Sequence, residues 1–248
     1  MRQKFAVFVF AALCWAQVSA QSTAYVFKGG LSLGTQKWDN SFDRQVLFKS
    51  HAALAIESVN NEDDRSSVFA QFGYHTRGSA IRSRFLFNGG GVSTFTQEFT
   101  FSNFSLILGA KQKFDLGPKS KYYYYGGLRG DYTLKTNIDE LQPPGGVEPA
   151  FATYFYLSNP VIGGVQRWMA GLSVGGGMEF MFSDLIGGQL ELSVHPDLTS
   201  QYRTPPLTTS VQDPFTGGFV SIPERRIKNT TIELSLGLRL LRKVVYED

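Results

Sequence analysis

The chain alternates apolar and polar residues over long stretches, with a period of two. Residues 231–240 read T-I-E-L-S-L-G-L-R-L, in which every second residue is apolar. The same alternation runs through residues 189–195 and, less strictly, through residues 167–180. A period of two indicates β-strands that have one apolar and one polar face. We therefore predict an all-β fold, because no segment after residue 20 shows a helical period.

Eight such strands are predicted along the chain. They lie near residues 25–37, 48–59, 67–77, 96–114, 122–136, 165–182, 187–201 and 227–240. An even number of strands is typical of closed antiparallel barrels, and eight is the size at which side chains fill the interior. The prediction is one domain, an eight-stranded antiparallel up-and-down barrel.

The links between these strands alternate in length. Short links at residues 60–64, 115–119 and 183–186 interleave with long links at about 38–47, 78–95, 137–164 and 202–226. Most of the ten prolines lie in the last two long links, where no strand needs a backbone donor. Membrane barrels have short turns at one end and long loops at the other, so this spacing favours a transmembrane barrel.

The first twenty residues decide between a soluble and a membrane barrel. Arg2 and Lys4 precede an apolar run over residues 5–15, and Val18-Ser19-Ala20 has small residues at the cleavage positions. This pattern predicts a signal peptide over residues 1–20, removed on export to the cell outer membrane, and a barrel domain over residues 21–248. Cys14, the only cysteine, lies within the signal, so the exported chain needs no disulfides.

The charge composition excludes one class of partner. The chain has 24 basic and 21 acidic residues, and removal of Arg2 and Lys4 leaves 22 basic residues against those 21. A nearly neutral chain has no electrostatic attraction for nucleic acid. A 14% aromatic fraction and 26 glycines are typical of strands and tight turns.

Strand parity then predicts a polar interior. If the leucine side faces lipid, ion-pairing residues share the lumen with Gln71 and His75; they are Lys28, Glu57, Arg77, Lys111, Arg129, Asp131, Glu179, Glu191, Glu233 and Arg239. These charges nearly balance, as a sealed lumen requires, because an unpaired buried charge costs several kcal/mol. Phe99 and Phe101 differ in parity from Phe104, Leu106 and Leu108, which predicts a bulge or the membrane boundary between them.

Aromatic clusters are expected at the membrane interfaces. The run Tyr122 to Tyr125 follows a short link, and Trp168 and Tyr154 are expected near the outward rim. Amphipathic rings gather at headgroup level in membrane barrels. The alternative is that aromatic residues are simply common in strands.

Catalytic and cofactor chemistry is weakly represented. His195 precedes Pro196-Asp197, and Ser200 could supply a hydroxyl, but no positioned nucleophile motif accompanies them. The acidic link at residues 61–64 lacks the spacing and glycine of a calcium loop, and Gly175-Gly176-Gly177 is followed by no helix that could bind phosphate. Those glycines are expected to let the wall bend or to leave room for Arg or Tyr in the lumen. We expect no enzyme activity, no metal and no cofactor.

Several segments resemble one known family. They are F-K-G-G-L-S-L-G, the pair L-A-I-E-S-V and F-A-Q-F-G-Y-H-T-R-G, the pair S-L-I-L-G-A-K-Q-K-F and Y-Y-Y-Y-G-G-L-R-G-D-Y, and E-L-S-L-G-L-R-L. In strand texture and spacing they resemble the PorT-like outer membrane β-barrel domain. The resemblance implies an eight-stranded barrel in the outer membrane of Gram-negative bacteria and a possible link to protein secretion. It brings no catalytic motif.

The long links are the expected place for partner contacts. Residues 137–164 carry Phe151, Tyr154, Phe155 and Tyr156 beside proline and glycine, so this loop is expected to contact a protein or glycan or to fold over the barrel mouth. The function predicted is a structural or partner-binding outer-membrane barrel in contact with lipid. Two alternatives stay open: a soluble barrel that carries a small apolar ligand, with Leu172, Leu192, Leu236 and Leu238 inside, and a lipid-modifying barrel enzyme.

Overall fold

The computed structural model describes residues 22–38, 44–59, 64–86, 92–137, 164–212, 217–222 and 224–243. The strands in these ranges are β1 (Ser22–Trp38), β2 (Arg44–Val59), β3 (Ser66–Leu86), β4 (Val92–Gly117), β5 (Ser120–Thr136), β6 (Gly164–Val165), β7 (Trp168–Met181), β8 (Ile186–Pro196), β9 (Tyr202–Thr204), β10 (Leu207–Gln212), β11 (Phe219–Ile222) and β12 (Arg225–Lys243). In these ranges no helix is both long and apolar enough to cross a membrane. The predicted signal over residues 1–20 lies outside them.

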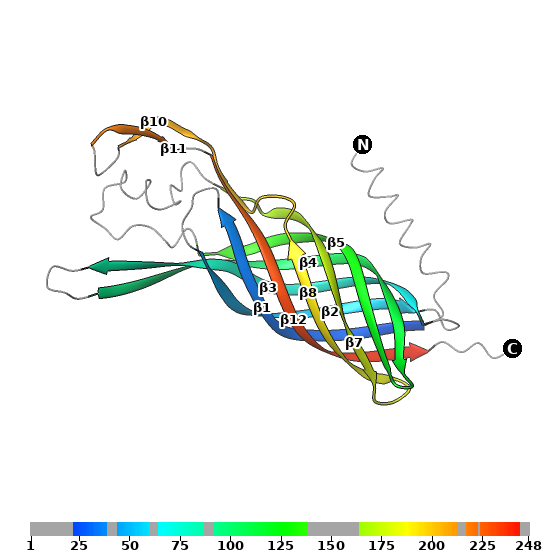
Figure 1. Ribbon diagram of the computed structural model, residues 1–248. Helices are drawn as coiled ribbons and strands as arrows, with labels where there is room; N and C mark the ends of the chain where they lie inside the picture. Colours follow the sequence, from blue (N-terminus) through cyan, green and yellow to red (C-terminus); the bar gives the residue numbers. More distant parts are fainter. Residues whose placement is uncertain are drawn as a thin grey trace, which may run out of the picture.

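Eight of the described strands close into one antiparallel barrel (Figure 1). Their order around the wall is β1-β2-β3-β4-β5-β7-β8-β12, and β12 pairs with β1 along its length, from Lys243 opposite Ser22 to Ile227 opposite Trp38. Each barrel strand pairs with its neighbours in sequence, as the predicted up-and-down topology requires. The predicted fold class is confirmed.

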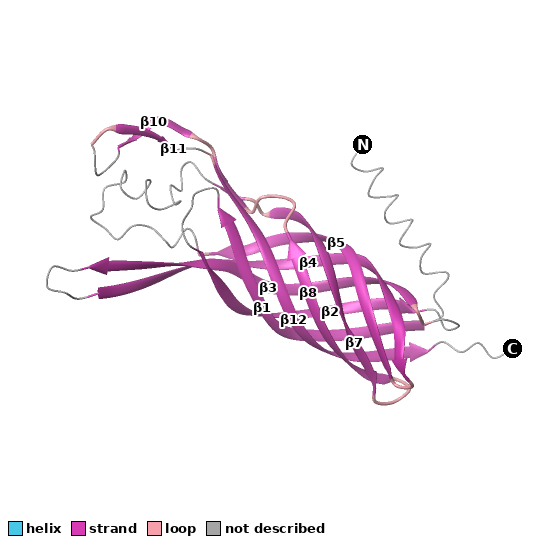
Figure 2. Cartoon of the chain, viewed as in Figure 1, coloured by secondary structure: helices cyan, strands magenta, loops and turns pink. Residues whose placement is uncertain are grey.

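The two ends of the barrel differ, as Figure 2 shows. At one end, which we call the turn end, short turns join β4 to β5 and β7 to β8, and β1 begins and β12 finishes there. At the other end, the loop end, β3 and β4 continue past the barrel as a paired hairpin out to Leu86 opposite Val92. The predicted long link over residues 78–95 is therefore wrong in its secondary structure. Strand pairing persists there although the sequence no longer alternates, because no lipid-facing row is needed beyond the wall.

The remaining strands lie at the loop end. The short strand β9 pairs with both β12 and β6, while β10 and β11 form a separate hairpin. Together these strands replace part of the predicted long link over residues 202–226. Within the described residues, the extra sheet lies at the loop end.

The wall has an apolar outer face and a polar inner face. Along β5, Tyr124 and Leu128 are exposed by 58% and 69%, whereas Tyr125 and Arg129, each one position further along, are buried. The four leucines that a soluble carrier would need inside, Leu172, Leu192, Leu236 and Leu238, are all on the exposed side, and Glu179, Glu191 and Glu233 are buried. This arrangement is the reverse of a soluble barrel with an apolar cavity, so the structure contradicts that alternative.

Aromatic rings gather on the outer face at two levels. Near the turn end, Phe114 stacks on Tyr122 and Tyr124, with ring centroids 4.9 and 5.7 Å apart. Toward the loop end, Tyr132 packs against Trp168. The predicted interface cluster at residues 122–125 is only half correct. Tyr123 and Tyr125 point inward because successive residues of a strand face opposite sides.

In the fourth strand, the phenylalanines that break the apolar alternation lie on the inner face of the barrel. Phe99 and Phe101 are buried inside the barrel, on the same face of β4 as Asn103 and Ser105. Phe104 and Leu106 are on the outer face, as expected. The register shift between Ser102 and Asn103 places the extra residue, Leu134, in β5, so β4 itself has no bulge there. Parity in β4 is therefore continuous, and the two phenylalanines belong to the interior.

Candidate functional site

The barrel interior holds a continuous set of charged and hydrogen-bonding side chains. All ten residues predicted for the lumen are buried there: Lys28, Glu57, Arg77, Lys111, Arg129, Asp131, Glu179, Glu191, Glu233 and Arg239. They come from all eight barrel strands, since inward positions recur at every second residue of each strand. The set is arranged in layers from the turn end to the loop end.

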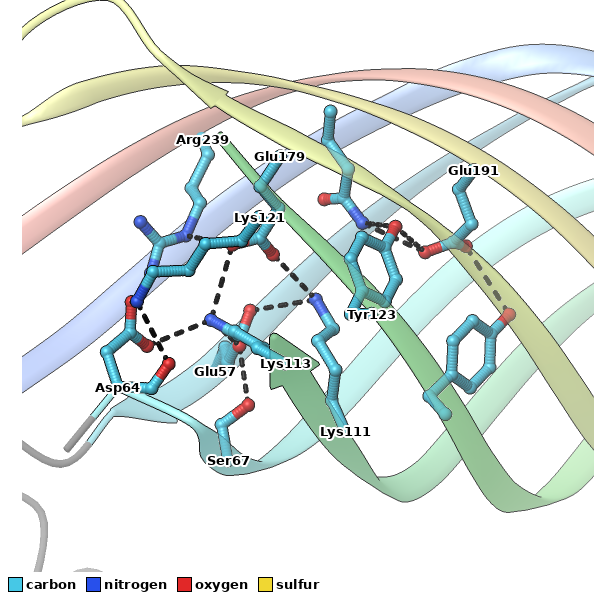
Figure 3. A network of polar contacts seen from close by, with 12 residues as sticks. Glu57, Asp64, Ser67, Lys111, Lys113, Lys121, Tyr123, Glu179, Glu191 and Arg239 are labelled. Atoms are coloured by element: carbon cyan, nitrogen blue, oxygen red, sulfur yellow. Dashed lines mark hydrogen bonds and ion pairs between the residues drawn. The ribbon is translucent and has the colours of Figure 1, made fainter. Parts of the chain in front are cut away.

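The layer nearest the turn end is built on two lysines of β4 (Figure 3). Lys111 Nζ lies 3.0 Å from Glu57 Oε2 and 3.2 Å from Glu179 Oε1. Lys113 Nζ lies 2.6 Å from Glu57 Oε1 and 3.4 Å from Glu179 Oε2. Ser67 donates a further hydrogen bond to Glu57 Oε1. Each carboxylate thus has two ammonium partners, which offsets the cost of removing these charges from water.

Asp64 closes this layer at the mouth of the barrel. Its carboxylate accepts hydrogen bonds from Lys113 Nζ at 3.1 Å and from Lys121 Nζ at 3.0 Å. Burial alone would raise the pKa of the Asp64 carboxyl, but the positive charge of Lys113 and the hydrogen bond from Lys121 hold that pKa below its ordinary value. Asp64 is therefore a carboxylate at neutral pH and carries one of the negative charges of the network.

The next layer is centred on Glu191 of β8. Lys28 donates to both of its carboxylate oxygens, at 2.9 and 2.8 Å, and Tyr123 Oη donates to Oε2 at 2.7 Å. Gln189 donates to the same oxygen, and Tyr125 Oη lies 3.3 Å from Oε1. The carboxylate is thus satisfied by four residues, from strands β1, β5 and β8.

Three histidines surround the single carboxylate of Glu233 in the third layer. His75 Nδ1 lies 3.5 Å from its Oε1, and His195 Nε2 and His51 Nε2 lie 3.3 and 3.9 Å from its Oε2. Ser193 Oγ lies 2.9 Å from His195 Nε2. The hydroxyl and the carboxylate therefore meet the same ring nitrogen, whereas a nucleophile relay needs them on opposite nitrogens. Among the described residues, no group of three or more His, Cys, Asp or Glu is arranged to hold a metal ion.

Two arginines and two aspartates form the fourth layer. Arg77 Nη2 lies 3.1 Å from Asp131 Oδ2, and Arg77 Nη1 lies 2.8 Å from Asp197 Oδ1. Arg129 Nε lies 3.0 Å from Asp131 Oδ2, and Arg129 Nη2 also contacts Asp197. Each arginine thus bridges both carboxylates, and the four charges cancel within the layer.

Uncharged groups close the loop end. Amide and hydroxyl side chains come first: Asn229 donates to Asp197 and Gln201, Gln36 donates to Asn229, and Thr133 donates to Asn103. Above them lies an apolar cluster made of Phe99, Phe101, Tyr202 and Ile227, which we call the apolar cap. The lumen is therefore sealed by side chains at this end.

Glycines on the inner face of β7 make room for the larger side chains of β5. A Cβ at Gly177 would lie 2.7 Å from Tyr123 Oη, and a Cβ at Gly175 would lie 2.7 Å from Tyr125 Cε1. A Cβ at Gly171 would lie 3.0 Å from Arg129 Nη2. Of the two roles expected for the glycines, the structure supports room for Arg and Tyr in the lumen.

Several interior residues were not among those expected. Lys113, His51, Asp197 and Tyr123 share the inward face with expected neighbours. The period of two would have identified Lys113 from Lys111, and Tyr123 from Arg129. The expected loop contact residues Phe151, Tyr154, Phe155 and Tyr156 lie outside the described residues, so their predicted role stays a prediction. The sequence suggests Ser200 as a source of a hydroxyl near His195, but the hydroxyl that lies beside His195 Nε2 belongs to Ser193.

No family model matches the chain, and no curated protein matches it, so the PorT-like resemblance stays a prediction. Solved structures do match. Neisserial surface protein A is 10% identical, with 88% of this chain and 97% of that chain covered and a TM-score of 0.44. The outer membrane protein OprG from Pseudomonas aeruginosa is 8% identical, with 90% and 98% covered and a TM-score of 0.46. The outer membrane protease OmpT from Escherichia coli is 9% identical, with the same coverage and TM-score.

Proposed function

We propose that the chain is an integral outer-membrane barrel that serves as a sealed, non-catalytic scaffold and presents its loop end to a partner. The observation that carries this proposal is the sidedness of the wall, with leucine and aromatic rows outside and paired charges inside. Exposure of that apolar outer face to water would cost free energy. Inside a wall surrounded by hydrocarbon, an unpaired charge would also cost free energy, so the charges there are paired. Only a lipid environment satisfies both faces together.

The height of the apolar band agrees with a membrane. Tyr122 and Tyr132 both face outward on β5, one in each aromatic level, and ten residue steps separate them. Ten steps of about 3.3 Å at a strand tilt of about 40° span roughly 25 Å along the barrel axis. That is about the height of the apolar band in outer-membrane barrels.

The filled interior favours a scaffold role and argues against the roles of a pore and of an enzyme. Four ionic layers and the apolar cap fill the lumen, so we expect no conductance steps in planar bilayers. The cavity lined by His51, His195 and Glu233 has a volume of about 10 Å³, which is about the space for one water and too small for an acyl chain. The extended β3–β4 hairpin and the β10–β11 hairpin supply surface for a protein partner at the loop end. The link to secretion rests on the PorT-like resemblance.

A charge placed on the outer wall tests the membrane assignment. Leu192 lies mid-wall on β8, paired with Leu234, and is 55% exposed. We expect Leu192→Arg to lower the free energy of unfolding in lipid vesicles by about 2–4 kcal/mol. Leu198→Arg is the matched control, because Leu198 is 54% exposed but lies beyond the end of β8. Equal small effects of the two substitutions, or a wild-type chain that stays dissolved without detergent, would contradict the assignment.

A further inference from the structure

The turn end of the lumen opens into a pocket of about 400 Å³. The charged residues that line it are Arg239, Lys119, Lys121, Asp64, Glu179 and Asp184. The pocket is distinct from the apolar cap, which closes the opposite end, and no role assigned above uses it.

Arg239 is the unusual residue of this pocket. Its side chain is 2% exposed, and neither Nε nor Nη2 has a hydrogen-bond partner. The nearest carboxylate oxygen, Glu179 Oε2, lies 3.8 Å from Nε, beyond hydrogen-bond distance. Nη1 reaches only the sulfur of Met181, at 3.7 Å. A buried guanidinium with two unused donors is costly unless something accepts from them.

The carboxylates of this layer are bonded mainly to the lysines and not to Arg239. Three buried cations, Lys111, Lys113 and Arg239, meet two buried carboxylates, Glu57 and Glu179, among the described residues of the layer. Both carboxylates are already bonded to the lysines, as Figure 3 shows. At the mouth, Asp64 and Lys121 pair with each other, and Asp115 lies 3.7 Å from Lys121. Arg239 thus has only the long ion pair with Glu179, at 3.8 Å, whereas both lysines have closer carboxylate partners.

We propose that this pocket binds a small oxyanion, phosphate or carboxylate, through the free N–H groups of Arg239. Both groups offer two oxygens to the fork of a guanidinium, which is the geometry that arginine recognises best. Lys119 at the pocket wall is a further cation, whereas Lys121 is already paired with Asp64. Met181 lies over Nη1, and its flexible side chain is the part that has to move for the anion to reach the arginine. The site does not depend on the membrane orientation proposed above.

The test is titration of the folded barrel in detergent micelles with inorganic phosphate and, separately, with acetate, measured by calorimetry. We expect saturable one-to-one binding of phosphate that acetate displaces. Arg239→Gln is expected to weaken binding at least tenfold, and Met181→Ala to strengthen it. Arg242→Gln is the matched control: it removes the same charge from an exposed position three residues along β12 and should leave affinity unchanged.

Two results would overturn the site. One is the absence of saturable binding of either anion to the wild-type barrel, and the other is an equal loss of affinity in Arg239→Gln and Arg242→Gln. Electrophoretic mobility with and without heating shows whether each variant has folded. If Arg239→Gln does not fold, Glu179→Gln replaces it. Removal of that carboxylate should raise phosphate affinity severalfold, and an unchanged or lower affinity would contradict the proposal.

Discussion

The two ends of the lumen are closed by opposite chemistry. The loop end is covered by Phe99, Phe101, Tyr202 and Ile227, which need no partners and exclude water. The turn end depends on lysines and carboxylates around an open pocket. A barrel of this size can therefore be sealed at one end by packed apolar side chains and keep charged side chains accessible at the other end. Substitutions at the two ends should therefore have different effects on the free energy of unfolding and on its pH dependence.

The largest effect is expected from removal of a buried charge at the turn end. Lys113 is fully buried between Glu57, Asp64 and Glu179. Lys113→Met leaves these carboxylates with fewer partners, so we expect a loss of about 3–5 kcal/mol in the free energy of unfolding. Urea titration of the barrel in lipid vesicles measures it. Lys121→Met, at the half-exposed mouth, is the control and should cost about 1 kcal/mol or less. Equal costs would show that burial does not govern the network.

Removal of the most fully buried ring of the apolar cap comes next. Phe101 is fully buried, so Phe101→Ala should lower the unfolding free energy by about 3 kcal/mol, from lost burial and the cavity left behind. The same urea titration measures this loss. The variant should still conduct no ions, because the amide and arginine layers lie beneath the cap. Current steps through Phe101→Ala barrels would show that the cap alone seals the lumen.

Acid is expected to lower the stability of the barrel by a smaller amount, and this effect should again differ between the two ends. The lowered pKa of Asp64 means that its stabilisation is present above its unfolded-state pKa, near 3.8, and is lost as pH falls through the folded value. We expect stability to fall below about pH 4 in the wild type and less steeply in Asp64→Asn.

At the loop end, hydrogen bonds from Arg226 and Arg203 lower the pKa of the partly exposed Glu224. Solvent and salt screen that cluster, so Glu224→Gln should leave the pH profile of unfolding unchanged. If Glu224→Gln changed the pH dependence of unfolding and Asp64→Asn did not, the expected difference between the two ends would be contradicted.

Parity made most of the wall predictable. Strict alternation in residues 231–240 puts Leu236 and Glu233 on opposite faces, and the membrane assignment drawn from the predicted signal then places Leu236 outside, where the structure has it. The same rule places Tyr123 and Tyr125 inside. Because the run contains four identical residues, however, its sequence shows no alternation of apolar and polar types. The prediction therefore treated that run as one surface cluster.

The pairing of charges was not predictable from the sequence. Lys28 and Glu191 are separated by 163 residues, and they meet because β12 lies between their strands in the closed wall. Which inward residues share a layer depends on strand tilt and stagger, and the local sequence does not specify these. The β3–β4 extension was missed for a related reason, because strands beyond the membrane need no apolar row.

Spin-label accessibility along three consecutive residues of β12 tests the sidedness of the wall most directly. Single labels at Leu234, Ser235 and Leu236 are compared in lipid vesicles. We expect labels at 234 and 236 to collide freely with oxygen dissolved in lipid, and a label at 235 to be shielded from oxygen and from a water-soluble paramagnetic reagent. The opposite pattern, with 235 open to solvent and 234 and 236 shielded, would contradict the account.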